Sequence, residues 1–129
     1  MEIVIEQFIH AAAAVLDVDP ERLVPAVKVS LAESALAAPF ASFGGQDFYS
    51  DPITRAAVLA SRIMRNHPLP DGNKRVALVL MDVYLQSQGF EFGAEPEAID
   101  EVFRAVAARS LAEDDFVAWL REHVEKADR

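Results

Sequence analysis

Cysteine is absent from all 129 residues of the chain. Disulfide bonds, thiolate metal sites and a cysteine nucleophile are therefore excluded, and the composition is compatible with a reducing compartment. No apolar run reaches the length of about 20 residues that crosses a bilayer. The N-terminal stretch MEIVIEQF has neither the basic flank nor the small-residue cleavage site of a signal peptide. We therefore expect a soluble, cytoplasmic protein without a membrane partner.

Positive charge is also scarce, because 12 lysine and arginine residues stand against 21 acidic ones and leave a formal net charge of −9. Such a chain suits a nucleic-acid backbone poorly, and we expect no direct nucleic-acid contact. Residues 53–75 are the exception, with five basic residues against one acid, a local balance of +4. That concentration fits a small anionic ligand such as a phosphate chain, or a basic helix face in solvent. The five are Arg55, Arg62, Arg65, Lys74 and Arg75.

Alternation typical of strands is rare, and apolar residues recur with the helical period. The length fits one domain, over residues 1–129, and 52% hydrophobic residues suffice for a core, so we predict an all-α bundle. The stretch 76–85 is apolar almost all round, which favours a helix at the centre of the bundle. We predict helices over residues 2–16, from a capping box at 30–33 to before 39, from 51 to about 66, and from 71 to 88. Two C-terminal helices follow, and a capping box at 110–113 opens the second of them.

One conspicuous irregular segment, PFASFGGQDFYSD at residues 39–51, separates two predicted helices. It carries four aromatic residues around Gly44-Gly45, a pair that is typical of a tight hairpin turn. The aromatic side chains could be exposed on a flap that holds an extended chain, or they could fold back onto the core. Both readings are compatible with the sequence.

The predicted helix start at Asp71-Gly72-Asn73-Lys74-Arg75 has the wrong charges for a helix N-terminus. Free backbone N–H groups and the helix dipole make that end positive, so each nearby cation costs about 0.3–1 kcal/mol. A bound anion would reverse the sign of this effect, and a glycine would let the anion approach the backbone closely. This conflict is the strongest indication of a phosphate site in the sequence.

The neighbouring residues fit the same site. His67 has an ordinary pKa of about 6.5, which suits a general base for a hydroxyl. Asp71 could be an oxygen ligand of Mg²⁺, which binds through one or two carboxylates and phosphate oxygens, or simply the helix N-cap. Asn73 could donate its amide to phosphate, and Arg75 offers a bidentate fork. Each also has a structural reading, as a loop histidine or as a side chain in solvent.

The string His67-Pro68-Leu69-Pro70-Asp71-Gly72-Asn73-Lys74-Arg75 closely resembles the Fic/Doc signature, H-x-F-x-D/E-G-N-G-R in Fic adenylyltransferases. Doc-type (death-on-curing) toxins have a lysine in place of the second glycine, as Lys74 is here. The segments 33–36 (ESAL), 43–45 (FGG) and 66–68 (NHP) also resemble Doc-type proteins. The resemblance covers essentially the whole chain.

The resemblance implies a compact Fic/Doc-like helical bundle with a short flap hairpin, and a toxin that is neutralised by a Phd-like antitoxin. Doc-type toxins are kinases that transfer the γ-phosphate of ATP to a threonine of elongation factor Tu and inhibit translation. By position His67 would be the catalytic base, and Asp71 would hold Mg²⁺ and take part in catalysis. The other implied sites are the phosphate and nucleotide cradle (Gly72, Asn73, Lys74 and Arg75, the last also catalytic) and the target-positioning flap (Phe43, Gly44 and Gly45).

Two departures from the family pattern bear on function. Leu69 replaces the usual aromatic third residue of the signature. No Ser/Thr-x-x-x-Glu-Gly/Asn inhibitory motif is present, because Ser30 and Glu33 are one residue too close, so we expect inhibition from another chain. A Fic-type adenylyltransferase and a catalytically silent interaction protein remain alternatives to the kinase. A metal hydrolase is a weaker one, since the three histidines are scattered.

Overall fold

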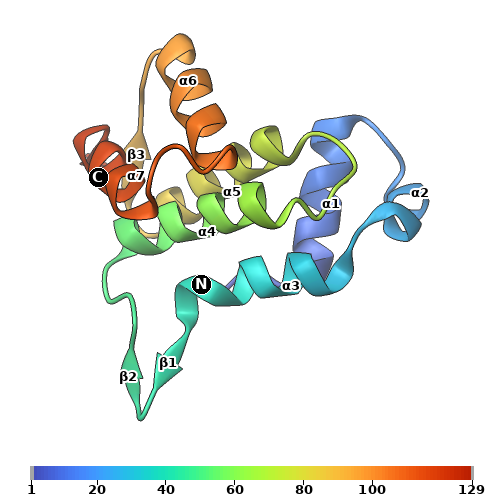
Figure 1. Cartoon of the computed structure of the whole chain (residues 1–129), viewed down its shortest axis with the longest axis horizontal. Coiled ribbons are helices and arrows are strands. Elements are labelled where there is room, and N and C mark those ends of the chain that lie inside the picture. Colours follow the sequence, from blue (N-terminus) through green and yellow to red (C-terminus); the bar gives the residue numbers. More distant parts are fainter. Residues whose placement is uncertain (1, 129) are drawn as a thin grey trace.

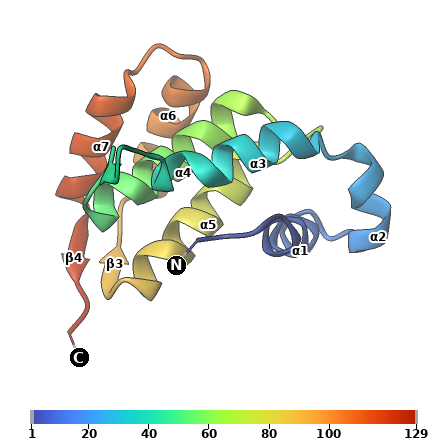
Figure 2. The same cartoon turned by 90° about the horizontal axis from the view of Figure 1, so that it is seen from below.

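The computed structural model describes residues 2–128 and confirms a mostly helical fold with two short antiparallel strand pairs (Figures 1 and 2). The helices are α1 (Ile5–Leu16), α2 (Pro20–Leu23), α3 (Val29–Ala37), α4 (Pro52–Asn66), α5 (Asn73–Ser87), α6 (Pro96–Ala107) and α7 (Glu113–Glu122). Short 3-10 turns occupy Val24–Ala26 and Ala38–Phe40. The strands are β1 (Ser42–Phe43), β2 (Gln46–Asp47), β3 (Phe90–Phe92) and β4 (Val124–Lys126).

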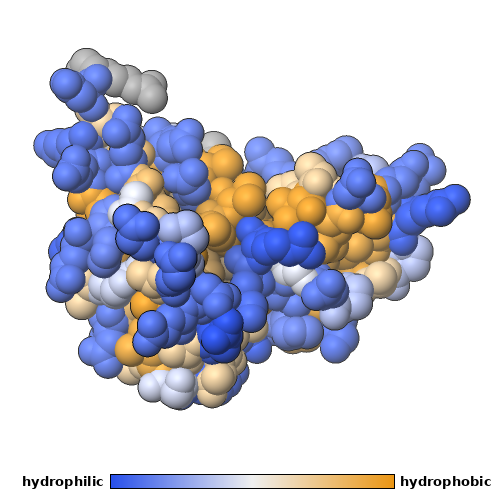
Figure 3. Space-filling model, turned by 90° about the horizontal axis from the view of Figure 1, so that it is seen from above, coloured by the Kyte–Doolittle hydropathy of each residue, from blue (hydrophilic) through white to orange (hydrophobic). Residues whose placement is uncertain are grey.

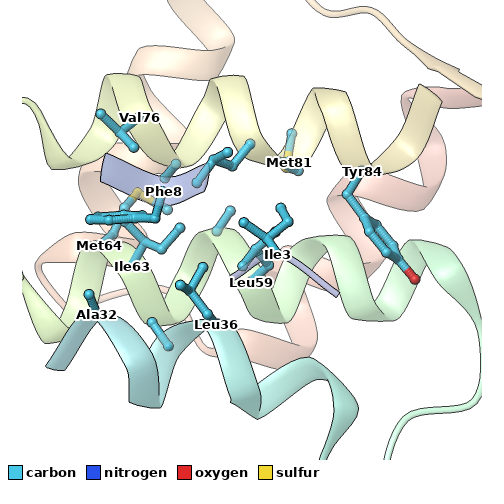
Figure 4. Packing of buried hydrophobic residues seen from close by; sticks show 14 of the residues in the cluster. Ile3, Phe8, Ala32, Leu36, Leu59, Ile63, Met64, Val76, Met81 and Tyr84 are labelled. Atoms are coloured by element: carbon cyan, nitrogen blue, oxygen red, sulfur yellow. The ribbon is translucent and has the colours of Figure 1, made fainter. Parts of the chain in front are cut away.

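The centre of the fold is the pair α4 and α5, which pack along each other. Helices α3, α6 and α7 pack against α4, and α1 packs against α5. The core between them contains Phe8 from α1, Leu59 and Ile63 from α4, and Met81 and Tyr84 from α5 (Figure 4). These side chains come from three helices and form one buried cluster. The cluster fixes α4 and α5 relative to each other, and so fixes the two ends of the loop that joins them.

Helix α5 is less buried than its composition predicts. Val79 and Val83 are 39% and 45% exposed, so α5 lies at the centre of the fold, as predicted, with one face open to solvent. Helix α4 takes the more central place, because its residues 56–61 are all buried. Figure 3 shows apolar and hydrophilic residues mixed on one side of the molecule.

Only one of the predicted side-chain N-caps forms as expected among residues 2–128. Asp51 caps α4, accepting a hydrogen bond from the Thr54 N–H at 2.9 Å, with Pro52 as the first helical residue. The predictions of capping boxes at Ser30 and Ser110 are wrong, because the N-caps are Lys28 for α3 and Ala112 for α7. Neither of those two N-caps has a side-chain cap hydrogen bond.

The irregular segment forms the expected hairpin. Strands β1 and β2 pair with Ser42 opposite Asp47, and Gly44 and Gly45 between them have φ values of 59° and 79°. Two positive φ values in a two-residue loop are the signature of a type I′ turn, which glycine adopts without strain. Figure 1 shows the hairpin projecting away from the helices.

The aromatic residues of this segment divide between the two predicted arrangements. Phe43 and Phe48 are 81% and 61% exposed, as expected for a flap. Phe40 packs edge-on against Tyr84 of α5, and Tyr49 is half-buried against α4. The hairpin therefore has an exposed tip and an anchored base.

Residues 2–128 contain a short apolar helix, Ile5–Leu16. Within them no single helix is both long and apolar enough to cross a bilayer. The bent pair Pro20–Ala26 and Val29–Phe40 meets the length and composition criteria only when its two halves are counted together.

Candidate active site

The loop between α4 and α5 opens onto a pocket of about 320 Å³. Most of its lining comes from the segment that the sequence singles out. The lining residues are Met64, His67, Pro70, Asp71, Gly72, Asn73, Lys74, Arg75 and Ala107. The structure thus brings the predicted histidine, acid, glycine and cations to one cavity, and it adds Met64 and Ala107 as an apolar wall.

His67 is the residue at which α4 ends. Its backbone is left-handed, with φ 54° and ψ 55°, and its N–H donates to the Ile63 carbonyl at 3.1 Å. A left-handed conformation is uncommon for residues other than glycine, and such strain tends to collect at functional sites. The conformation turns the chain sharply into the prolines and leaves the imidazole exposed at the pocket.

The carboxylate of Asp71 does not cap α5, so the prediction of Asp71 as the N-cap is wrong. Gly72 is the N-cap, with φ 79°, and no side chain hydrogen-bonds to the start of the helix. Asp71 Oδ1 instead accepts a hydrogen bond from the Gly72 N–H at 2.8 Å. Among residues 2–128 no hydrogen bond reaches the other carboxylate oxygen, and the side chain is exposed beside the pocket.

The first turn of α5 keeps the charge conflict expected from the sequence. It contains no acid, while Lys74 and Arg75 are both exposed at the pocket. Neither cation forms a salt bridge with any residue of the described chain, 2–128. The free N–H groups of this turn and two unpaired cations therefore face one cavity, an arrangement that attracts an anion.

Asn73 has a structural task that sequence reasoning missed. Its Nδ2 donates to the Leu69 carbonyl at 2.9 Å, and its Oδ1 accepts from the Leu69 N–H at 3.0 Å. Leu69 is buried between the two prolines, so its backbone polar groups need partners inside the protein. The side-chain amide of Asn73, which is 5% exposed, is therefore engaged in closing the loop. The backbone N–H is the group of this residue that can donate to an anion.

The three arginines of α4 do not line the pocket. Arg62 pairs with Glu113 at 3.0 Å, and Arg55 pairs with Asp47 at 3.0 Å. Arg65 donates to the carbonyls of Val106 and Leu111 at 3.2 and 2.8 Å and so joins α4 to the end of α6. The local balance of +4 thus overstates the charge available to an anion, because three of those five cations have partners within the chain.

The loop is also fastened to α3. The Lys28 N–H donates to the Pro68 carbonyl at 2.9 Å, and Asn66 Nδ2 donates to the Leu31 carbonyl at 3.0 Å. These contacts hold both sides of His67 against a neighbouring helix. No local sequence pattern reveals them, since the partners lie 35 or more residues apart.

A second, more apolar groove of about 380 Å³ begins at the same two cations. It runs between α5 and α6, with Leu78, Ile99 and Phe103 as its apolar lining and Asp100 at its edge. Phe43, Gly44 and Gly45 line neither cavity. They lie on the projecting hairpin (Figure 1).

Metal ligands are few in the structure. Among residues 2–128 no three histidine, aspartate or glutamate side chains lie close enough to hold a metal ion by themselves. A metal at this pocket would have Asp71 as its protein carboxylate and would take further oxygen ligands from a bound phosphate. That ligand set is the one Mg²⁺ typically uses in phosphoryl-transfer sites.

Comparison with known proteins agrees with the motif. The sequence model of the Fic/DOC family matches residues 4–85, which include α1 to α4, the whole loop and most of α5. A curated relative, "Toxin Doc" of Mycolicibacterium smegmatis (strain ATCC 700084 / mc(2)155), is 33% identical over 92 residues, covering 70% of this chain and 71% of the relative. No solved structure shows a significant match. The chain belongs to the Fic/DOC family and, within it, to the Doc branch.

Proposed function

We propose that this protein is the toxin of a toxin–antitoxin pair and transfers the γ-phosphate of ATP to a threonine hydroxyl of elongation factor Tu, thereby inhibiting translation. The observation that carries the proposal is the first turn of α5, where free N–H groups, Lys74 and Arg75 face one pocket with His67. The similarity to a protein named "Toxin Doc" supports the toxin assignment. A cytoplasmic location follows from that target.

In the proposed reaction His67 takes the proton from the threonine hydroxyl as its oxygen attacks the γ-phosphorus. A new oxygen–phosphorus bond forms, the bond to the β–γ bridging oxygen breaks, and ADP leaves. The backbone N–H groups of Asn73 and Lys74 and the side chains of Lys74 and Arg75 bind the phosphate chain. The groove between α5 and α6 is large enough, at about 380 Å³, to take part of the nucleoside.

Asp71 fits the role of a Mg²⁺ ligand. Its exposed carboxylate has one oxygen committed to the Gly72 N–H, and the other is available at the pocket. When bound, Mg²⁺ would neutralise charge on the phosphate oxygens. Because Asp71 is not the N-cap of α5, its removal should affect metal and phosphate binding with little loss of helix stability.

The inhibitor of this toxin is, in our proposal, a Phd-like antitoxin on a separate chain. The one-residue mismatch between Ser30 and Glu33 leaves no inhibitory motif in the sequence, which is why we look for inhibition in trans. We further propose that residues 1–129 form one domain. Helices α6 and α7 lie beyond the family match but pack on α4, and Ala107 of α6 lines the pocket.

Intact-mass measurement of elongation factor Tu tests the proposal. After incubation with this protein, ATP and Mg²⁺, we expect the target to gain one phosphate, and ATP labelled at the γ position should transfer its label. A gain of AMP would instead identify an adenylyltransferase. No gain of mass on this or any other protein of a translation extract would support the catalytically silent alternative.

Lys74 is expected to decide between phosphoryl and adenylyl transfer. A side chain and a charge at this position change the cradle in which relatives with glycine seat a phosphate group. We expect Lys74→Gly to lower phosphoryl transfer by at least about tenfold, the equivalent of one lost charge-assisted hydrogen bond, and to allow some AMP transfer. Mass spectra of the target separate the two products, and an unchanged product and rate would remove Lys74 from this role. Lys126→Gly, at an exposed position of strand β4, is a suitable control.

A further inference from the structure

Arg55 of α4 contacts the flap, which we define as residues 41–50, and also the residue just before it. At the far end its Nε donates to the Tyr49 carbonyl at 2.9 Å and its Nη2 donates to Asp47 Oδ2 at 3.0 Å. At the near end its guanidinium carbon lies 5.3 Å from the ring centre of Phe40, the residue that precedes the flap. The planar guanidinium makes these contacts together, which a lysine cannot do.

Arg62, two turns further along α4, also contacts the flap. Its Nη2 donates to the Tyr49 hydroxyl at 3.3 Å, and the same guanidinium makes two hydrogen bonds with the Glu113 carboxylate at 3.0 and 3.2 Å. The hydrogen bond with Glu113 raises the pKa of Arg62 above its ordinary value. Burial by itself would raise the pKa of Glu113, but the hydrogen bond and charge of Arg62 lower it on balance.

Helix α7 thus takes part in holding the flap. Glu113 is its first residue, and Arg121, near its end, donates from Nη2 to Thr54 Oγ1 at 3.1 Å and approaches Asp51 Oδ2 at 3.4 Å. Asp51 follows directly on the flap. Both α7 residues lie beyond residue 85, where the family match ends, so this support is a feature of the C-terminal part of this chain.

The flap needs such external support. Its two strands have two residues each, and an isolated two-stranded hairpin is marginally stable in water. The exposed tip residues Phe43 and Phe48 bury too little surface to fix its direction. The orientation of the hairpin therefore depends on contacts at its base.

We propose that Arg55 and Arg62 are positioning residues, which hold the flap through Asp47 and Tyr49 in the orientation that presents a protein target to the pocket. The role in target binding rests on the proposed function, whereas the anchoring itself does not. We expect that loosening either anchor weakens binding of the protein target. Nucleotide binding and the chemical step should be preserved, because neither arginine lines the pocket.

Two variants test the anchors without leaving a buried charge unpaired. Tyr49→Phe removes one hydroxyl and leaves the Arg62–Glu113 pair intact. Arg55→Lys keeps the charge but cannot contact Tyr49 and Asp47 at once. The matched control is Arg22→Lys, at an exposed position of α2, away from the flap and from both cavities. Hydrogen exchange of the Phe48 amide, which donates to the Ala41 carbonyl at 3.0 Å, reports the order of the flap directly.

In both variants we expect flap amides to exchange about fivefold to tenfold faster, and KM for elongation factor Tu to rise by a similar factor, as for the loss of one partly exposed polar contact. The kcat, the affinity for ATP and amide exchange elsewhere should match those of Arg22→Lys. Unchanged flap exchange would overturn the anchoring. Faster exchange with an unchanged KM would overturn the positioning role. If the wild-type protein modifies no target, the proposed function fails, and the exchange rates alone decide whether these arginines hold the flap.

Discussion

Replacing His67 by asparagine should lower the rate of phosphoryl transfer by a factor of about 10² to 10⁴, the usual contribution of a general base, while the fold stays intact. His67 is exposed at the pocket, and its imidazole makes no hydrogen bond with any residue between 2 and 128, so it is available to accept a proton from a substrate. Asparagine fills the same place without a basic group. The affinity for ATP should persist, because the first turn of α5 is unchanged.

Asparagine is a better replacement here than alanine. His67 has φ 54°, and asparagine adopts the left-handed region more readily than most residues. Alanine would add a backbone cost of about 1 kcal/mol or more at this helix end, and loss of activity could then reflect a displaced loop. His10→Asn, on the exposed face of α1 away from the pocket, serves as the control. Transfer at the wild-type rate in His67→Asn would exclude His67 as the base.

The helices themselves could be predicted from the sequence, but several of their starts could not. The start of α4 was predictable because Asp51, Pro52 and Thr54 lie next to each other and form the cap locally. The start of α3 was not predictable from the local sequence. The Lys28 N–H donates to the Pro68 carbonyl, and with this tertiary contact the helix begins before Ser30. The signal of a capping box is weak wherever a distant contact fixes the same turn.

The candidate site shows the same division. The grouping of His67, Asp71, Lys74 and Arg75 followed from the motif and the charge conflict, and these residues do share one pocket. The task of Asn73 could have been inferred, since a buried Leu69 between prolines needs partners for its backbone and the next amide side chain along the chain is four residues on. The partners of the α4 arginines could not, because Arg62 and Glu113 are 51 residues apart.

Charge counting along the sequence was therefore informative only in part. It correctly marked residues 53–75 as unusual, yet the arginines of α4 connect the flap, α6 and α7, and only Lys74 and Arg75 remain for a ligand. A helix face rich in arginine can stabilise irregular segments around it as well as bind an anion. Which of the two applies depends on carbonyls and carboxylates contributed by distant segments.

Replacing Gly72 by alanine should lower the free energy of unfolding by about 2–4 kcal/mol, the sum of a strained backbone and local overpacking. Gly72 has φ 79°, a conformation that side chains with a Cβ rarely adopt. An added Cβ would collide with Leu16 Cδ2 of α1 and would lie 3.4 Å from Arg75 Nη2. Urea unfolding measures the effect as a lower midpoint at constant slope.

Gly89→Ala is the matched control for the backbone part of this cost. Gly89 has a similar φ of 85°, follows the end of α5, and has open space where a Cβ would be added. We expect it to cost about 1–2 kcal/mol, less than Gly72→Ala. A double-mutant cycle with Leu16→Ala then isolates the contact with α1, since removing the Leu16 side chain should recover the packing part of the loss in the Gly72 variant.

The same pair of variants relates the contact with α1 to the active site. In Gly72→Ala, Leu16 and Arg75 must move away from the new methyl group, so the first turn of α5 should bind ATP more weakly even where the protein remains folded. In Gly89→Ala, at the opposite end of α5, ATP affinity should equal that of the wild type at temperatures where both are folded. Equal stability losses in the two glycine variants would show that α1 does not constrain this turn. Equal ATP affinities would show that the phosphate cradle tolerates a side chain at position 72.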